Sequence, residues 1–180
     1  PGITEMLSLQ MLKGSRAGLN DVNSILLSES AAKAYFGSED PMGKVMKIDN
    51  KNDVKVTGVY KDLPYNSDFK DLTFLLPWSL YLSSQPWIKE MTNPWRSNFT
   101  QTYAMLAEHA DIDQVSAKIK DVKLHKVRPE ERAFKPVVFL HPMGKWHLFS
   151  EFKEGVNIGG RIEFVWLFGI IGGFVLLLAC

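Results

Sequence analysis

The stretch NSILLSESAAKAYFGSEDPMGK (residues 23–44) carries the signals for a strand, a helix and a turn in quick succession. Its segment SILL (24–27) is short and apolar, which predicts a buried strand. Ser28 is placed to cap a helix, and apolar residues at helical spacing follow it as far as Gly37, a residue that favours a left-handed helix stop. Pro41 then suits the second position of a turn. The stretch therefore predicts a strand, a short helix and a tight reversal of the chain.

A hairpin is expected directly after this stretch. The segments KVMKI (44–48) and DVKVTGVY (53–60) alternate in polarity, and the polar sequence DNKN separates them. Alternation with a polar connection is typical of two antiparallel strands. On this pattern we expect Val54, Val56 and Tyr60 to share one side of the second strand.

Later segments extend the same mixture of strands and helices. Alternation predicts three more strands, and in the first of them Leu72, Phe74 and Leu76 are expected to share a face. These strands are DLTFLLP (71–77), FTQTYAMLAE (99–108) and FKPVVFLHP (134–142). An amphipathic helix is predicted between the last two, because apolar residues form one helical stripe behind a capping pair, Asp111 and Gln114. The stripe consists of Ile112, Val115, Ile119 and Val122. Together these elements predict an α+β domain.

Composition bounds the class of protein. The chain has 180 residues, of which 46% are hydrophobic and 23% charged, so it is long enough to bury its own core. Its net charge of +1 gives no field that would attract a nucleic acid, and we expect no nucleic-acid partner. The single cysteine, Cys180, cannot form an internal disulfide, so the cysteine count does not indicate the cellular compartment.

The segment FVWLFGIIGGFVLLLAC (164–180) contains no charged residue. As a helix it would extend about 26 Å, close to the ~30 Å hydrocarbon core of a bilayer. A buried helix of a soluble protein is the alternative, but such a helix normally keeps some polar positions on a solvent face. We therefore interpret the segment as the start of a transmembrane helix. Phe164 and Trp166 would lie at the interface, and a small-residue face, formed by Gly169, Gly172 and Gly173, would pack against other helices.

The flank of this segment bears on its orientation. Lys153 and Arg161 are the only strong bases in the sixteen residues before it. Cytoplasmic flanks are usually richer in lysine and arginine. The folded part is therefore expected on the extracytoplasmic side.

No motif in the chain predicts catalysis. GSEDPMGK (37–44) resembles a phosphate-binding loop, but five residues separate its glycines where that loop has four. It would also follow a helix and precede a strand, the reverse of the required order. His141, His147 and Glu151 match no standard zinc spacing. A nucleophile elbow is also missing from the sequence. We therefore expect no catalytic residue, metal site or bound cofactor, and a protein that is not an enzyme.

The region of about 78–98 is irregular and rich in aromatic residues. Two interpretations stay open, since large aromatic side chains usually fill a core but also form ligand or partner surfaces. The candidate surface consists of Trp78, Tyr81, Trp87 and Trp95, with Phe99 and Tyr103 following in the sequence.

The motifs together resemble the MacB-like extracytoplasmic domain of FtsX-type ABC transporter permeases, particularly those of Bacteroidetes. In that family a short helix ends in Phe-Gly, as at Phe36-Gly37, and a D-P-x-G-K turn follows, as at residues 40–44. A D-x-P-x-N-S-x-F turn comes later, as at residues 62–69. The resemblance implies a mixed or antiparallel sheet with two packed helices in an extracytoplasmic domain spanning 1–163, followed at 164–180 by the start of a transmembrane helix.

The resemblance also implies a function and a setting. The chain would be a fragment of a permease in the bacterial inner membrane, with its domain on the periplasmic side. A separate ABC ATPase subunit would bind ATP and drive the membrane helices of a permease dimer. The domain would transmit this motion to an exported substrate or periplasmic partner, with Gly155, Gly159 and Gly160 as a hinge or, equally, as a plain loop. A module that binds a peptide or a lipid is the alternative function.

Overall fold

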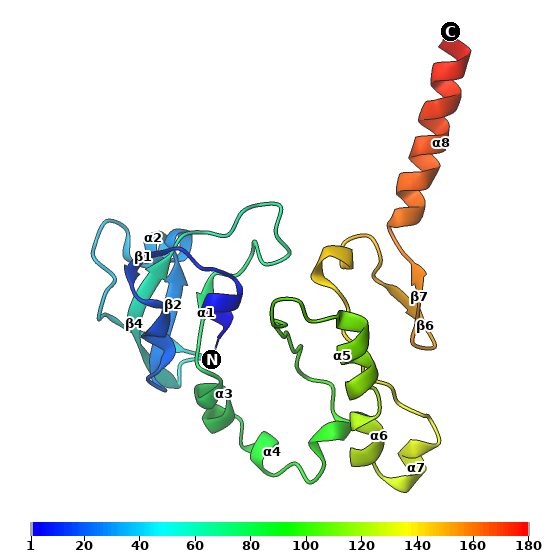
Figure 1. The fold of residues 1–180 in the computed structure, drawn as a ribbon. Coiled ribbons are helices and arrows are strands. Elements are labelled where there is room, and N and C mark those ends of the chain that lie inside the picture. Colours follow the sequence, from blue (N-terminus) through cyan, green and yellow to red (C-terminus); the bar gives the residue numbers. More distant parts are fainter. Residues whose placement is uncertain (1, 180) are drawn as a thin grey trace. The chain divides into compact units, whose positions relative to one another are not determined.

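The computed structural model describes residues 2–179 and divides the chain into two compact units. Unit 1 extends to Pro94, and unit 2 begins at Trp95. The fold class is α+β with a mixed sheet, as predicted, and the sheet belongs to unit 1 (Figure 1).

Five strands form the sheet of unit 1. Strand β4 is its centre, because β2 pairs with one edge of β4 in parallel, and β1 and β3 pair antiparallel with β4. Strand β5 extends the sheet on the far side of β2 in the antiparallel direction. The bounds are β1 Met11–Gly14, β2 Ser24–Ser28, β3 Val45–Ile48, β4 Asn52–Tyr60 and β5 Phe74–Leu75.

The opening motif folds as its sequence predicts. Helix α2 (Glu29–Phe36) lies between β2 and β3, and the Ser28 hydroxyl accepts a hydrogen bond from the Ala31 amide at 3.2 Å. Such a cap satisfies one of the amides that the first helical turn leaves unpaired. Gly37 ends the helix with a φ of 61°, a conformation that suits glycine.

Two apolar clusters lie on opposite sides of β2. Ile25 and Leu27 belong to the first cluster, whereas Leu26 belongs to the second, as alternation along a strand requires. On β4 the alternation changes phase, because the register with β2 skips Thr57. The first cluster also contains Val54, Val56 and Val59 of β4, and the second contains Tyr60.

The prediction that Val54, Val56 and Tyr60 share one side is therefore wrong for Tyr60. A bulge inserts one residue into the strand and reverses the facing of every side chain after it. Gly58 follows the bulge, where a Cβ would lie 2.7 Å from Leu26 Cδ2. The close approach at this point requires a glycine.

The remaining helices of unit 1 are short. Helix α3 (Trp78–Ser84) supplies Leu80 to the first cluster, so it is the second helix packed on the sheet after α2. The segment predicted as the strand 71–77 is shorter than expected, since only Phe74 and Leu75 pair with β2. Leu72 and Leu76 pack against different clusters. The other helices of unit 1 are α1 Ile3–Met6, the 3₁₀ helix η1 Arg16–Leu19 and α4 Pro86–Lys89.

Unit 2 contains helices and one two-stranded hairpin. Helix α5 begins after Asp111, whose carboxylate accepts hydrogen bonds from the amides of Asp113 and Gln114, as the predicted cap requires. The predicted stripe is divided between two helices, because α5 ends at Ile119 and α6 begins at Val122. The 3₁₀ helix η2 Pro94–Arg96 begins on the last residue of unit 1. The bounds of the other elements are α5 Ile112–Ile119, α6 Val122–Lys126, α7 Pro129–Arg132, η3 Met143–Lys145, β6 Glu151–Lys153, β7 Val156–Gly159 and α8 Ile162–Ala179.

The predicted strands 99–108 and 134–142 are wrong, since neither segment forms a strand. The second segment instead hydrogen-bonds to α5 and its end: the Val138 amide donates to the Lys120 carbonyl, and the Leu140 amide donates to the Ser116 hydroxyl. Alternation of polar and apolar residues indicates an extended chain, but a strand also needs a neighbouring strand. The hairpin β6–β7 was not predicted.

Candidate functional site

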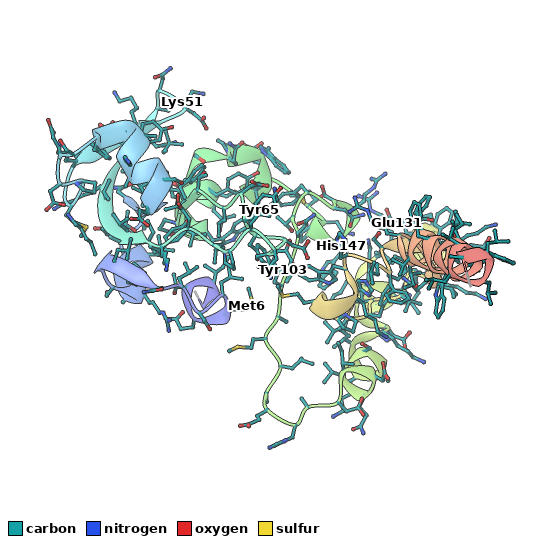
Figure 2. All side chains as sticks on the ribbon, turned by 90° about the horizontal axis from the view of Figure 1, so that it is seen from above. Met6, Lys51, Tyr65, Tyr103, Glu131 and His147 are labelled. Carbon is teal, nitrogen blue, oxygen red and sulfur yellow. The ribbon has the colours of Figure 1, made fainter. Side chains whose placement is uncertain are left out.

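Helix α8 is the most apolar element of the chain. It has 18 residues with a mean hydropathy of 2.3, and no part of it is buried. Figure 1 shows α8 continuing from the end of the β6–β7 hairpin, and Figure 2 shows it nearly end-on with side chains radiating on all sides. A helix that is apolar all round and unburied suits a lipid environment.

The residues predicted to meet the membrane all lie on α8. Phe164 and Trp166 are exposed near its start. The three glycines of the predicted packing face have no neighbouring atom where a side chain would be, so that face is open; they are Gly169, Gly172 and Gly173. The helix begins at Ile162, two residues before the predicted boundary.

Backbone contacts fix the start of α8 to the preceding segment. The Ile162 amide donates a hydrogen bond to the Leu148 carbonyl at 3.1 Å. Gly160 has a φ of 130°, and a Cβ on it would lie 3.1 Å from that same carbonyl oxygen. Gly159 is also left-handed, with a φ of 114°. Two of the three predicted hinge glycines therefore lie at a tight join, because other residues rarely adopt these conformations.

The third predicted hinge residue, Gly155, lies in the turn of the β6–β7 hairpin. Its φ is 80°, and a Cβ there would meet open space. Glu154 before it also has a positive φ, of 51°. These conformations are typical of a tight hairpin turn, so Gly155 and the other two glycines are placed at opposite ends of the hairpin.

Aromatic contacts connect the hairpin to the body of unit 2. Phe152 of β6 packs against Phe139, with ring centroids 5.4 Å apart, and lies perpendicular to His141 at 5.1 Å. Asn157 of β7 donates from Nδ2 to the Phe149 carbonyl at 2.8 Å. Since residues 138–140 bind α5, a continuous set of contacts extends from α8 through the hairpin to that helix.

The predicted aromatic surface is exposed, which disfavours the interpretation that its members fill a core. Trp78 and Tyr81 lie together on α3 with ring centroids 5.1 Å apart, and they expose 50% and 39% of their surfaces. Trp87 on α4 donates from Nε1 to Gln85. Trp95 belongs to the other unit, together with Phe99 and Tyr103, and Tyr103 packs on Trp146.

The D-P-x-G-K turn (40–44) is hydrogen-bonded to the sheet. The Gly43 amide donates to the Val56 carbonyl on β4 at 2.8 Å. The carboxylate of Asp40 accepts from Lys13 Nζ at 2.9 Å and from the Met42 amide. The pKa of Asp40 is lowered, mainly by the hydrogen bond from Lys13. Lys44 pairs with Glu39. These contacts give the turn a structural role.

The second turn motif is connected to the first helix through Asp62. Its Oδ1 accepts from the Ser30 amide at 3.1 Å and from the Ser30 hydroxyl at 2.9 Å. Partial desolvation opposes ionisation, but the hydrogen bonds from Ser30 and Ser28 prevail and lower the pKa of Asp62. A carboxylate at the start of α2 also interacts favourably with the helix dipole. Sequence reasoning did not find this contact, because the partners are 32 residues apart.

Titratable side chains elsewhere do not gather into a metal site within residues 2–179. His141 lies against the hairpin, and His147 and Glu151 are exposed.

Comparison with known proteins identifies the family. The model of the MacB-like periplasmic core domain matches residues 1–122. No curated protein matches the chain. Among solved structures, the periplasmic region of MacB from Actinobacillus actinomycetemcomitans is 28% identical over 47% of this chain and 38% of that one, with a TM-score of 0.39. A domain of a protein described as a permease from Porphyromonas gingivalis is 22% identical over 72% of this chain and 58% of that one, with a TM-score of 0.49. The chain thus spans less than two thirds of each.

Proposed function

Because the chain belongs to the family of MacB-like periplasmic core domains, we propose that it is the extracytoplasmic domain of an ABC transporter permease subunit. In this proposal α8 anchors the domain in the bacterial inner membrane, and the folded part lies on the periplasmic side. A separate ATPase subunit binds and hydrolyses ATP, and the permease acts as a dimer. The domain itself performs no catalysis and binds no cofactor.

The mechanical role rests on the join between α8 and the segment before it. Ile162, the first residue of α8, is hydrogen-bonded to Leu148, and Gly160 packs against the same carbonyl. A helix joined in this way moves together with the segment that it contacts. The β6–β7 hairpin then carries the displacement to Phe139 and His141. We therefore assign Gly159 and Gly160 to the joint, with Gly155 at its outer end.

An insertion experiment in the intact transporter tests this role. A flexible Gly-Ser-Gly-Ser insert between Gly159 and Gly160 separates α8 from the hairpin, so transport per ATP hydrolysed should fall sharply while ATP hydrolysis continues. The same insert between Glu154 and Gly155 lengthens only the hairpin turn and serves as the matched control. Transport that stays at the wild-type level with the first insert contradicts the proposal.

A second candidate function is the binding of a peptide or lipid on α3. It is supported by the exposed pair Trp78 and Tyr81, since large exposed aromatic side chains are enriched at binding surfaces. A saturable change in tryptophan fluorescence on adding the exported substrate, lost in Trp78→Ala, is expected. The variant Trp166→Ala on α8 is the control, and equal signal loss in both variants argues against a site on α3.

A further inference from the structure

A cavity lies next to the β6–β7 hairpin, and the function proposed above assigns no ligand to it. Its volume is about 410 Å³, within the range of small-molecule sites. Three phenyl rings line it, from Phe139, Phe149 and Phe152, and Val156 of the hairpin adds a further apolar wall. The cavity therefore suits a hydrocarbon chain.

The polar groups of this cavity favour an anion. Lys145 and His141 line it, and no Asp or Glu is among its lining residues. Asn157 also lines the cavity, but both ends of its amide are engaged, by the Phe149 carbonyl and the Gly159 amide. His141 Nε2 is buried and has no hydrogen-bond partner among the residues that the structure describes.

A buried ring nitrogen without a partner costs free energy, and buried polar groups in proteins are nearly always hydrogen-bonded. Nε2 is buried, so a ligand reaches it only when a neighbouring side chain moves. The Phe152 ring, which also lines the cavity, is such a neighbour and lies perpendicular to the imidazole at 5.1 Å. A carboxylate is the group that fits, because it accepts from an imidazole and from the ammonium of Lys145.

The position of the cavity indicates where such a ligand comes from. Phe149, which lines the cavity, follows Leu148, whose carbonyl accepts the hydrogen bond from Ile162 at the start of α8. Gly155 and Val156 line it at the turn of the hairpin, so the cavity lies along the hairpin that joins α8, on the side of the chain that would face the membrane surface. This step rests on the proposed function, in which α8 is a membrane span. Amphiphilic molecules collect at that interface with their polar groups outward.

We propose that this cavity binds a single-chain anionic amphiphile of the fatty-acid type. Its carboxylate pairs with Lys145 and His141, and its first methylene groups lie on the phenyl rings of Phe139, Phe149 and Phe152.

Photo-crosslinking of the full chain in phosphatidylcholine nanodiscs tests the site. The probe is dodecanoate carrying a diazirine near its carboxylate, and mass spectrometry locates the attachment points. Saturable labelling within residues 139–157 is expected. Dodecanoate should compete with the probe about tenfold better than dodecanol, because dodecanol lacks the charge-assisted hydrogen bonds.

Two variants sharpen the result. Lys145→Gln should weaken labelling about tenfold, whereas Lys118→Gln, which removes an exposed charge on α5, should leave it unchanged. Labelling confined to α8, equal competition by dodecanol, or no response to Lys145→Gln overturns the proposal.

Incorporation of the chain into the nanodiscs is scored separately and reports on α8 alone. If the chain does not incorporate, the anchor proposal fails, and the same labelling in a nonionic detergent still decides the site.

Discussion

Units 1 and 2 differ in how they bury apolar side chains. Of the buried apolar residues that the structure describes, all but Val127 belong to unit 1. Unit 1 has a five-stranded sheet with a cluster on each side, whereas unit 2 has short helices and a two-stranded hairpin. An isolated hairpin is only marginally stable in water. Unit 1 therefore has the buried core that cooperative unfolding requires. Unit 2 depends more on local hydrogen bonds and on the environment of α8.

The largest effect is expected from emptying the core of unit 1. Leu26→Ala should lower the free energy of unfolding of unit 1 by about 2–5 kcal/mol, because Leu26 is fully buried and its removal leaves a cavity. Leu12→Ala, at an exposed position of β1, should change it by less than about 0.5 kcal/mol. Urea unfolding followed by hydrogen exchange measures both. If exchange in unit 2 increases as much as in unit 1, the two units are not independent.

The next largest effect is expected from adding a side chain where two strands of unit 1 approach closely. Gly14 has a φ of 72°, and a Cβ there would lie 2.3 Å from the Thr57 carbonyl oxygen on β4. Gly14→Ala should therefore destabilise unit 1 by about 1–3 kcal/mol. Gly43→Ala is the matched control, since φ is 76° and the nearest atom is a flexible Lys55 carbon at 3.6 Å. Thermal unfolding should separate the two variants, and equal shifts would show that the contact with Thr57 is unimportant.

Removing one helix cap in each unit tests the difference between the units directly. Ser28→Ala removes the cap of α2 and should lower the stability of unit 1 by about 1 kcal/mol. Asp111→Ala removes the cap of α5, and without a core behind that helix the loss should stay local. Hydrogen exchange should then rise across the whole of unit 1 for the first variant, but only within α5 for the second. A global loss of protection in unit 2 would contradict the comparison.

The smallest effect is a dependence on pH confined to unit 1. The folded pKa of Asp62 is lowered, so the carboxylate stabilises the fold above its unfolded pKa, and this contribution is lost as pH falls through the folded pKa. Stability should thus decline below about pH 4, the ordinary range of an aspartate. Asp62→Asn should reduce that decline without abolishing it. If the stability of the variant falls with pH as that of the wild type does, the charge of Asp62 adds nothing to its hydrogen bonds with Ser30.

The elements of unit 1 could largely be predicted because their signals are local. Ser28 and Gly37 bracket α2, and alternating residues give β3 and β4. The strand predicted at 134–142 failed because its extended backbone binds Lys120 and Ser116 in place of another strand. The β6–β7 hairpin was missed for the opposite reason, since its strands are too short to show alternation.

In the candidate site, too, the local features were predictable from the sequence and the long-range contacts were not. The apolar character of α8 was evident in the sequence, as were the glycines before it. The contact of Ile162 with Leu148 and the cavity lined by His141 and Lys145 required the structure.

The sequence by itself determined the α+β class, the helix stop at Gly37 and the apolar final helix, because capping, glycine conformation and hydropathy act between residues close in the chain. Only the tertiary structure decided which face Tyr60 presents, since a one-residue bulge at Thr57 reverses a strand and is set by its pairing with β2. The same holds for the capping of α2 by Asp62, a contact between residues that meet only when the sheet has formed.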